Sequence, residues 1–395
     1  MKRLLARLFA AIFTPPVQVA LSRLVLRFGP RLIRFGDFVF VYRWQDVYDV
    51  LHRDEDFLIA PVNGERITAV SGPFILGMDR SPELFRQREC VYKAMQEADF
   101  GLIGSNLTAG IADCLAQARQ NGGKIDVVNG YSRRVAARTA CAYFGVSGPD
   151  EKTTFRVMRA IFYETFLNVA NDEDVRKAGI AAGKELSGWL EVEVERRRKS
   201  GNLGGDVLGR LMHHAPGLGF NDEAVRWMLS GLIVGAVDTT ATVTANVIKE
   251  VIGDRELLAS MRRDLGNQTA LRGWCWDALR RRPHNPVVLR SAGAAAQVAD
   301  KPVKPGAKVY AATLAAMQDP SAFPDPKLMR PDRPEKSYMH FGHGLHECSG
   351  RQINAMQIPA LVGALVAEGV SGSAGISFDG PFPDELIVRL GGAKS

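Results

Sequence analysis

The stretch FGHGLHECSG, residues 341 to 350, decides how this chain is interpreted. It sets Cys348 among three glycines and two histidines, with too few large side chains to pack as ordinary core. The segment that follows, SGRQINAMQIPALVGALV, predicts a helix that begins at or just after the cysteine. A helix N-terminus and nearby backbone N–H groups favour a thiolate, and Gly342, Gly344 and Gly350 permit tight turns and close approach to a flat ligand. The pattern therefore predicts a metal-coordinating cysteine.

The composition indicates one large globular domain covering residues 1–395. The chain is 46% hydrophobic, which is ample for a core, and no repeat, low-complexity tract or linker divides it. Lys and Arg outnumber Asp and Glu by 50 to 43, an excess that suits an acidic partner or a membrane surface but is too dilute for nucleic acid. Five scattered cysteines without a CxxC pair encode neither a disulfide framework nor a zinc ribbon, so we expect a cytoplasmic protein.

Residues 1–30 are basic and apolar. The run from Leu4 to Phe13 is too short to span a bilayer, and no cleavage site follows it, so it predicts neither an anchor nor a signal peptide. Leu21, Leu24 and Phe28 then fall at helical spacing beside arginines. Two interpretations remain open: peripheral contact with an anionic membrane, and, more simply, a solvated basic face on a helix packed against the body.

Helical patterns dominate the chain, and strand patterns are confined to its ends. The expected fold class is therefore mostly α with small β-sheets. The expected helices cover residues 82–99, 107–121, 131–145, 152–170 and 175–199, the last ending in the solvated run EVEVERRRK; the expected strands lie in residues 38–44, 307–313 and 385–390.

Residues 221–253 predict a helix of about 30 residues, or roughly 45 Å, that is apolar on nearly every face in its middle. Asp238 and Thr239 interrupt this apolar middle directly after Gly235 and Ala236. In the structural interpretation the hydroxyls bond back to carbonyls one turn earlier and Asp238 reaches an arginine. In the functional interpretation the helix opens locally, its acid and hydroxyl deliver protons, and the two small residues leave room for a flat ligand.

Asp277 and Arg280 stand three residues apart on a further helical pattern, where they are able to pair. Such a pair is common by chance, and a surface ion pair is its simplest explanation. Pro283 and Pro286 then end the helix and lead into an extended run toward Arg290.

These motifs together resemble the cytochrome P450 superfamily. FGHGLHECSG is similar to its haem-binding loop, through Phe341, Gly344, His346, Cys348 and Gly350. GAVDTT (235 to 240) resembles the acid and threonine signature of its long central helix, and Asp277-x-x-Arg280 resembles its ExxR motif. MDRSPELFRQR (78 to 88) resembles the stretch entering its third helix, and RPDRP, with Arg333, falls where the family has the loop below the haem.

The resemblance implies that haem b lies between the long helix and the cysteine loop, with Cys348 as the axial ligand of the iron. Arg88, Arg290 and His346 match positions that hold the haem propionates, while Gly235 and Ala236 leave room for the ring. Two departures stand out. Aspartate at 277 replaces the family's glutamate, which shifts its network with Arg280 and Arg333, and Leu84 replaces a histidine that binds a propionate in many bacterial members.

The activity implied is a haem-thiolate monooxygenase, which inserts one oxygen atom from O2 into a hydrophobic small molecule, with Asp238 and Thr239 organising proton delivery. The chain has no flavin or iron–sulfur signature, so NAD(P)H-derived electrons would come from a ferredoxin- or flavodoxin-type donor with its reductase. Arg351, Arg86 and Lys93 are the expected docking residues.

Three alternatives remain open: a peroxide-dependent peroxygenase or hydroperoxide isomerase on the same fold, a non-catalytic haem-thiolate sensor, and a zinc or non-haem iron site of His340, His343, His346 and Cys348. The expected pocket side chains are nearly all apolar, which predicts a hydrophobic substrate, although each also suits ordinary core. They are Phe74, Ile75, Phe162, Val234, Val237, Val287 and Val288.

Overall fold

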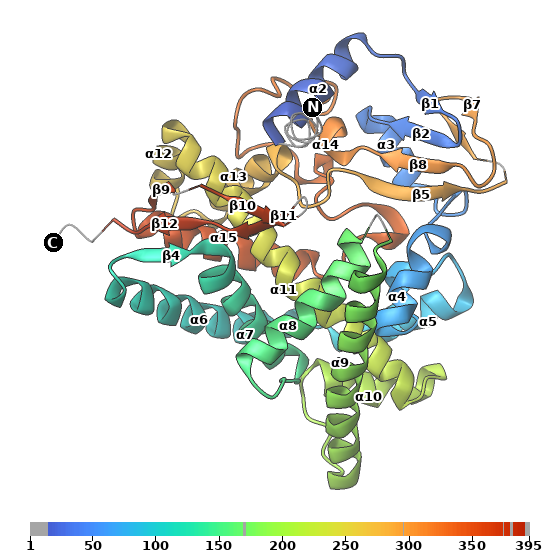
Figure 1. Cartoon of the computed structure of the whole chain (residues 1–395), viewed down its shortest axis with the longest axis vertical. Helices are drawn as coiled ribbons and strands as arrows, with labels where there is room; N and C mark the ends of the chain where they lie inside the picture. Colours follow the sequence, from blue (N-terminus) through green and yellow to red (C-terminus); the bar gives the residue numbers. More distant parts are fainter. Residues whose placement is uncertain (1–14, 169–170, 295, 374, 380–381, 392–395) are drawn as a thin grey trace.

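The computed structural model describes residues 15–168, 171–294, 296–373, 375–379 and 382–391. Helices make up most of it and gather around a central one, α11, as Figure 1 shows. The helices are α2 (Pro15–Phe28), α3 (Trp44–His52), α4 (Glu65–Ser71), α5 (Pro82–Ala94), α6 (Phe100–Gln120), α7 (Arg133–Phe144), α8 (Glu151–Phe162), α9 (Glu173–Ser200), α10 (Val207–His214), α11 (Asp222–Gly253), α12 (Arg255–Arg263), α13 (Gln268–Arg281), α14 (Thr313–Ala316) and α15 (Arg351–Ala367).

The largest sheet joins the beginning of the chain to its last third. Its order is β1 (Ile33–Phe35), β2 (Phe38–Val41), β8 (Lys308–Ala311), β5 (Val288–Ala292) and β3 (Phe57–Leu58). The β2–β8 pair is parallel, with Phe38 opposite Lys308, and the other pairs are antiparallel. In Figure 1 the blue strands β1 and β2 accordingly lie beside the orange strands β5 and β8.

Three smaller sheets lie elsewhere on the fold. One has the order β4 (Lys124–Asp126), β12 (Ile387–Arg389) and β9 (Ser371–Ser373); the others pair β10 (Ser377–Asp379) with β11 (Phe382–Glu385) and β6 (Gln297–Val298) with β7 (Lys301–Pro302).

Helix α11 has 32 residues, about 48 Å, and begins where the sequence predicts, with the Asn221 side chain accepting a hydrogen bond from the Ala224 N–H at 2.9 Å. Among the described helices it is the one long and apolar enough to cross a bilayer, but 72% of its apolar window is buried inside the protein. It is therefore a core helix, as its apolar middle predicts.

Two apolar cores meet along α11. Its N-terminal half, including Val225 and Val237, packs into a core shared with α8, α9 and α10. Its C-terminal half, including Ala241 and Val251, packs into a second core shared with α13 and α15. The polar residues Asp238 and Thr239 lie at the junction of these two cores. A site between the two halves of the molecule would therefore lie at this junction.

The predicted fold class is confirmed, and the differences from the expected elements are local. The helix expected over residues 152–170 is α-helical only to Phe162 and continues as a π-helical turn, η5 (Tyr163–Leu167). The strand expected over residues 38–44 stops at Val41, because Trp44 already begins α3.

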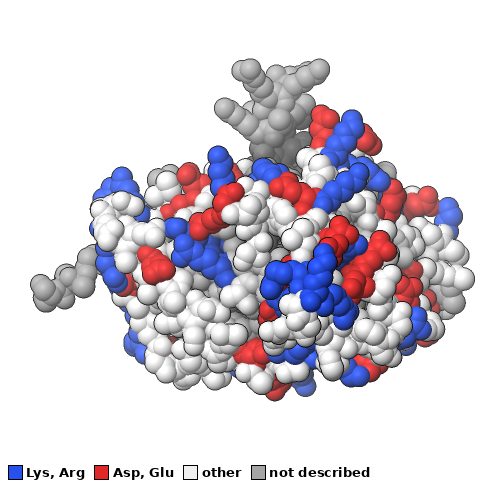
Figure 2. Space-filling view, turned by 90° about the horizontal axis from the view of Figure 1, so that it is seen from below, with Lys and Arg blue, Asp and Glu red and all other residues white. Residues whose placement is uncertain are grey.

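The charged end of α9 is solvated, as its sequence predicts. Arg196 pairs with Glu193 at 2.7 Å and Lys199 with Glu195 at 3.1 Å. Figure 2, which views the molecule from the end toward which α9 projects, shows acidic and basic side chains interspersed on this face. Such a face gives no single-sign field for a nucleic acid.

Candidate functional site

The cysteine loop runs from η7 (Glu335–Ser337) through the single turn η8 (Gly344–His346) to α15. The Cys348 N–H donates to the Phe341 carbonyl at 2.9 Å, and the Cys348 carbonyl accepts from the Arg351 N–H at 3.2 Å. Gly342 and Gly344 adopt φ angles of 68° and 72°, as tight turns require. A Cβ at Gly344 would come within 2.6 Å of the Leu51 carbonyl oxygen, so only glycine fits there.

Gly350 caps α15 without a left-handed backbone, at φ −85°. A Cβ at this position would lie 3.7 Å from the Cys348 sulfur, an ordinary contact. The expected turn at Gly350 is present, because the Arg351 N–H donates to the Cys348 carbonyl at 3.2 Å, but its ordinary φ angle means that this turn does not require glycine.

The thiol of Cys348 also differs from the expectation. Burial raises its pKa, and the Gly350 N–H only partly opposes this shift. The backbone and the helix terminus are thus too weak to produce a thiolate by themselves. A coordinated cation would supply the missing stabilisation, because a metal deprotonates the thiol that binds it.

The three histidines of the segment point to three different backbone carbonyls. His340 Nε2 lies 2.8 Å from the Trp276 oxygen, His343 Nε2 lies 3.0 Å from the Tyr338 oxygen, and His346 Nε2 lies 2.8 Å from the Met78 oxygen. No cluster of three or more His, Cys, Asp or Glu suited to a metal ion occurs within the described residues. The alternative of a zinc or non-haem iron site is therefore wrong.

One face of α11 keeps accessible surface although the helix runs through the core. Gly235, Ala236 and Thr239 are half-buried on this face, whereas Val234 and Val237 beside them are buried. A Cβ on Gly235 would meet no atom within 4 Å. The Thr240 hydroxyl, one residue on, contacts the Asn354 side-chain oxygen at 3.4 Å, so the start of α15 and the middle of α11 are neighbours.

The hydroxyl of Thr239 donates to the Gly235 carbonyl at 2.5 Å, and that of Thr240 donates to the Ala236 carbonyl at 2.8 Å. These are the backward bonds of the structural interpretation, and the helix does not open locally. Because the Thr239 proton is engaged, the lone pairs of its oxygen are left to accept a hydrogen bond on the half-buried face.

Asp238 is buried and forms an ion pair with Arg133 of α7 at 2.9 Å. One carboxylate oxygen, Oδ1, takes the Arg133 Nε–H at 2.9 Å, while Oδ2 is buried without a hydrogen-bond partner among the described residues. Burial raises the pKa of Asp238, and the Arg133 charge opposes that shift. A half-satisfied carboxyl of raised pKa is suited to proton transfer.

Arg290 is a buried cation without a carboxylate. Its guanidinium donates to the Leu289 carbonyl at 2.9 Å, but it enters no ion pair in the described part of the chain. Desolvation lowers the pKa of Arg290 to about 10, and burial likewise lowers the pKa of His346, to which the nearby Arg290 charge adds. Arg88 reaches the same loop by donating to the Leu345 carbonyl. Arg88, Arg290 and His346 thus lie at or near one loop, and Asp54 and Asp79 are near Arg290 without forming an ion pair with it in the described residues. This set of donors fits the propionates of a haem.

The Asp277–Arg280 pair is not the surface pair that its spacing suggests by chance. Both side chains have no accessible surface and lie 2.7 Å apart, and Arg333 reaches the same carboxylate at 3.0 Å. Tyr338 donates its hydroxyl to Asp277 at 3.2 Å, and the Arg330 N–H donates to the second oxygen at 3.0 Å. The shorter aspartate therefore still joins both arginines, so the predicted network is present despite the substitution.

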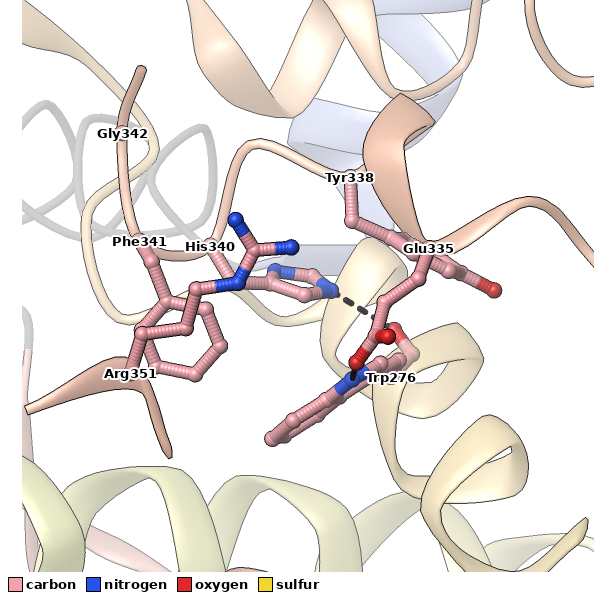
Figure 3. Close-up of a pocket in the computed structure, with 7 residues that line it drawn as sticks. All are labelled: Trp276, Glu335, Tyr338, His340, Phe341, Gly342 and Arg351. Atoms are coloured by element: carbon pink, nitrogen blue, oxygen red, sulfur yellow. Dashed lines mark hydrogen bonds between the residues drawn. The ribbon is translucent and has the colours of Figure 1, made fainter. Parts of the chain in front are cut away.

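A small pocket lies on the outer side of the cysteine loop, between the loop, α13 and the first residue of α15 (Figure 3). Trp276 donates its indole N–H to Glu335 at 3.1 Å, and burial lowers the pKa of His340 to about 4, so His340 is neutral. Arg351, at the rim, pairs with Glu347. The docking arginine predicted here is therefore already neutralised by a neighbour.

The expected substrate residues divide into two groups. Five of them are buried in the same core as the N-terminal half of α11 and expose almost no surface: Phe74, Ile75, Phe162, Val234 and Val237. Val287 is 41% exposed and Val288 is half-buried in β5. In this structure the five are packed as core side chains, which was the alternative interpretation. Of the expected substrate residues, Val287 and Val288 have surface that a ligand could contact.

Sequence reasoning missed Arg133 and Tyr338, which complete the two buried acid sites, and His284, described below. Arg133 is one of three arginines in α7, and nothing in the local sequence distinguishes it. Nothing local marks the other two either, because the side chains around them come from distant parts of the chain.

Comparison with known proteins agrees with this geometry. Residues 176–368 match the family model for cytochrome P450. Biflaviolin synthase of Streptomyces coelicolor is 32% identical over 194 residues, covering 48% of this chain and 46% of that protein. The C-19 steroid 1alpha-hydroxylase of Sorangium cellulosum is 26% identical over 247 residues, covering 62% of this chain and 61% of that protein. These alignments thus span about half to three fifths of the relatives' length.

Solved structures extend the likeness of the fold to nearly the whole chain. CalO2 superposes with a TM-score of 0.82 at 21% identity, over 95% of this chain and 96% of its own. Epothilone D-bound cytochrome P450epoK superposes with a TM-score of 0.81 at 19% identity, over 95% and 96%. Residues 176–368 therefore match the cytochrome P450 family, and nearly the whole chain has the fold of the solved cytochrome P450 structures.

Proposed function

We propose that the protein is a haem-thiolate monooxygenase that inserts one oxygen atom from O2 into a hydrophobic small molecule, with residues 1–395 forming a single domain. The observation that carries this proposal is that the start of α15, directly after Cys348, lies against the middle of α11, where Asn354 contacts Thr240, next in sequence to Asp238 and Thr239. The likeness of the fold to CalO2 spans 95% of this chain and 96% of that one, which supports the one-domain assignment.

The residues described above fit a haem b group. Cys348 would bind the iron, and Arg88, Arg290 and His346 would hold the propionates, which would give Arg290 an ion-pair partner. Phe341, Gly344 and Gly350 of the loop and the small residues Gly235 and Ala236 of α11 would hold the ring. When bound, the haem supplies an iron whose thiolate ligand favours cleavage of an O–O bond.

Asp238 and Thr239 then take part in proton delivery. Thr239 holds a water or a proton-bearing oxygen as an acceptor, because its own proton is fixed on the Gly235 carbonyl. Asp238 has a free oxygen and a raised pKa, so it takes up and releases a proton more readily than an exposed aspartate near neutral pH. Arg133 positions this carboxyl by binding its other oxygen.

Electrons would reach the site from a ferredoxin- or flavodoxin-type donor and its reductase, supplied by NAD(P)H, across the surface that carries the pocket of Figure 3. The pairing of Lys93 with Glu89 at 2.6 Å and of Arg351 with Glu347 weakens the simple electrostatic attraction of an acidic donor. Arg86 lies over the Phe220 ring, and Phe85 and Tyr92 on the same helix are each 44% exposed. Docking therefore combines charge with aromatic contact, and we expect a moderate salt dependence.

We further propose that the protein is cytoplasmic and contacts a membrane surface through residues 1–30, of which residues 1–14 lie outside the described part. Helix α2 buries Val19 and Leu26 against the body. It leaves Val17, Leu21, Leu24 and Phe28 exposed at helical spacing. The exposed face is thus apolar rather than simply basic, which supports the membrane interpretation. Cosedimentation with vesicles of neutral and of anionic lipid tests this, and an absence of binding to both would refute it.

The absorption spectrum of the dithionite-reduced protein with carbon monoxide tests the central proposal. We expect the long-wavelength Soret band of thiolate-bound haem in the natural protein and its loss in Cys348→Ser. Cys275→Ser, at a buried cysteine away from the loop, is the matched control and should keep the band. A band at the position of imidazole-bound haem, or no haem in the natural protein, would refute Cys348 ligation. Product formation with a donor system then separates the monooxygenase from a sensor, and formation with peroxide alone would favour the peroxygenase.

A further inference from the structure

His284 is a polar side chain in apolar surroundings. It follows Pro283 in the segment between α13 and β5, and the residue is half-buried. Neither Nδ1 nor Nε2 has a hydrogen-bond partner among the described residues, and both atoms are shielded from solvent. Desolvation lowers its pKa to about 4, so the ring is neutral and offers one donor and one acceptor.

The surroundings of His284 are aromatic. Its ring centroid lies 4.8 Å from that of Phe382 in β11 and 5.9 Å from that of Phe162 in α8. The two phenylalanines contact each other edge-on at 5.8 Å. Both belong to the apolar core that includes Val234 and Val237 of α11, next to the accessible face with Gly235 and Ala236. His284 thus contacts the apolar core that also holds the N-terminal half of α11, on which Gly235, Ala236 and Thr239 keep accessible surface.

The charged groups around this cluster have partners of their own. Arg159 of α8 pairs with Asp384 of β11 at 2.6 Å. Arg282, two residues before the histidine, pairs with Glu250, and the Asn246 amide donates to the Arg282 carbonyl. A leucine or phenylalanine would fill the position of His284 without burying unmet polar atoms. Packing therefore does not account for a histidine here.

We propose that His284 is a specificity residue that binds a neutral oxygen, a hydroxyl or carbonyl, on an otherwise apolar substrate. This rests on the proposed function and names its substrate class as oxygenated hydrophobic molecules, as opposed to plain hydrocarbons. A carboxylate is disfavoured, since a neutral ring among aromatic side chains offers it no countercharge. A site built to bind an oxygen discriminates strongly against the analogue that lacks it, because its own polar atoms then stay unpaired.

Equilibrium dialysis with p-menthane, menthone and menthol tests the proposal, because the three share one skeleton and differ in oxygen. In the natural protein we expect menthol or menthone to bind at least about tenfold more tightly than p-menthane. In His284→Phe the ratio should fall to about one through loss of the oxygenated ligands. In His284→Gln, which keeps a donor and an acceptor, it should partly return. Equal binding of all three ligands by the natural protein, or an unchanged ratio in His284→Phe, would overturn the proposal.

Thermal unfolding without ligand separates binding from a structural contribution. If the imidazole has no partner in the free protein, His284→Phe should unfold at the same or a higher temperature. A marked fall in Tm, with an unchanged ligand ratio in His284→Gln, would mean that buried water satisfies the ring and would overturn the proposal. The carbon monoxide spectrum is measured in parallel. If the natural protein lacks the thiolate-haem band but still prefers the oxygenated ligands, the haem site is refuted and the role of His284 is not.

Discussion

The two buried acids of this protein are paired with arginine in different ways. Asp277 has no accessible surface, and both of its oxygens are hydrogen-bonded, with Arg280, Arg333 and Tyr338 around it. Asp238 meets one arginine through one oxygen and leaves the other unpartnered within the described residues. A fully hydrogen-bonded network stabilises the local structure, whereas a carboxyl with an unpartnered oxygen is still able to bind a proton. The predictions below test that distinction, from the largest expected loss of stability to the smallest.

Breaking the network around Asp277 should cause the largest loss in the free energy of unfolding. Asp277→Ala leaves Arg280 and Arg333 buried without their carboxylate, and removing one partner of a buried pair costs about 3–5 kcal/mol. We expect little folded protein and no haem retention, measured by soluble yield and by denaturant unfolding. Asp277→Glu, which restores the length that the family uses, is the control and should cost less than about 1.5 kcal/mol. Normal stability of the alanine variant would show that the network is dispensable.

Lowering the pH should destabilise the protein through the neutral histidine His284, a third kind of buried ionisable group. The folded-state pKa of His284 is depressed from 6.5 to about 4, so the unfolded state binds the proton first as the pH falls. Above pH 6.5 this histidine does not lower the free energy of unfolding. Between pH 6.5 and about pH 4 the free energy of unfolding falls, by about 2 kcal/mol at pH 5. Denaturant unfolding at pH 7 and pH 5 should show this loss in the natural protein and a smaller one in His284→Phe. Identical losses in both would contradict the assignment.

Altering the incomplete pair should cost little stability and much activity. Asp238→Asn keeps a hydrogen-bond acceptor for Arg133 but no charge, and we expect a loss of about 1–2 kcal/mol. Product formation should fall by about 100-fold, the contribution of a positioned acid–base group, with the carbon monoxide spectrum unchanged. Turnover within about twofold of the natural protein would place Asp238 with Asp277 as a structural acid.

Thr239 offers the finest test, because Thr240 makes the same backward bond beside it. Thr239→Val and Thr240→Val each remove one hydroxyl from α11, and each should change stability by less than about 1 kcal/mol. Only Thr239→Val should divert reducing equivalents from product to peroxide, because only Thr239 lies on the half-buried face. The ratio of product to NAD(P)H consumed measures this. Full coupling in Thr239→Val, or equal uncoupling in both variants, would contradict proton delivery through Thr239.

The fold was predictable from the sequence because its signals are local. The capped start of α11, the glycines at 342 and 344 and the helix after Cys348 depend on neighbouring residues, and the structure has all of them. The partners of the buried polar groups were not predictable in the same way. Arg133 lies 105 residues from Asp238, and Tyr338 lies 61 from Asp277. Nor does a one-dimensional pattern show whether Val237 lines a cavity or fills a core, since both need an apolar side chain.

The parallel pairing of β2 with β8 has a consequence for how the protein is made. Phe38 of β2 pairs with Lys308 of β8, so the sheet at the start of the chain stays incomplete until the ribosome has added residue 308. The cysteine loop is synthesised later still. During that interval the long apolar helix already exists without the segments that cover its second half, and such surface invites aggregation. We expect the nascent protein to depend on chaperones and to capture its cofactor only after the cysteine loop has been synthesised.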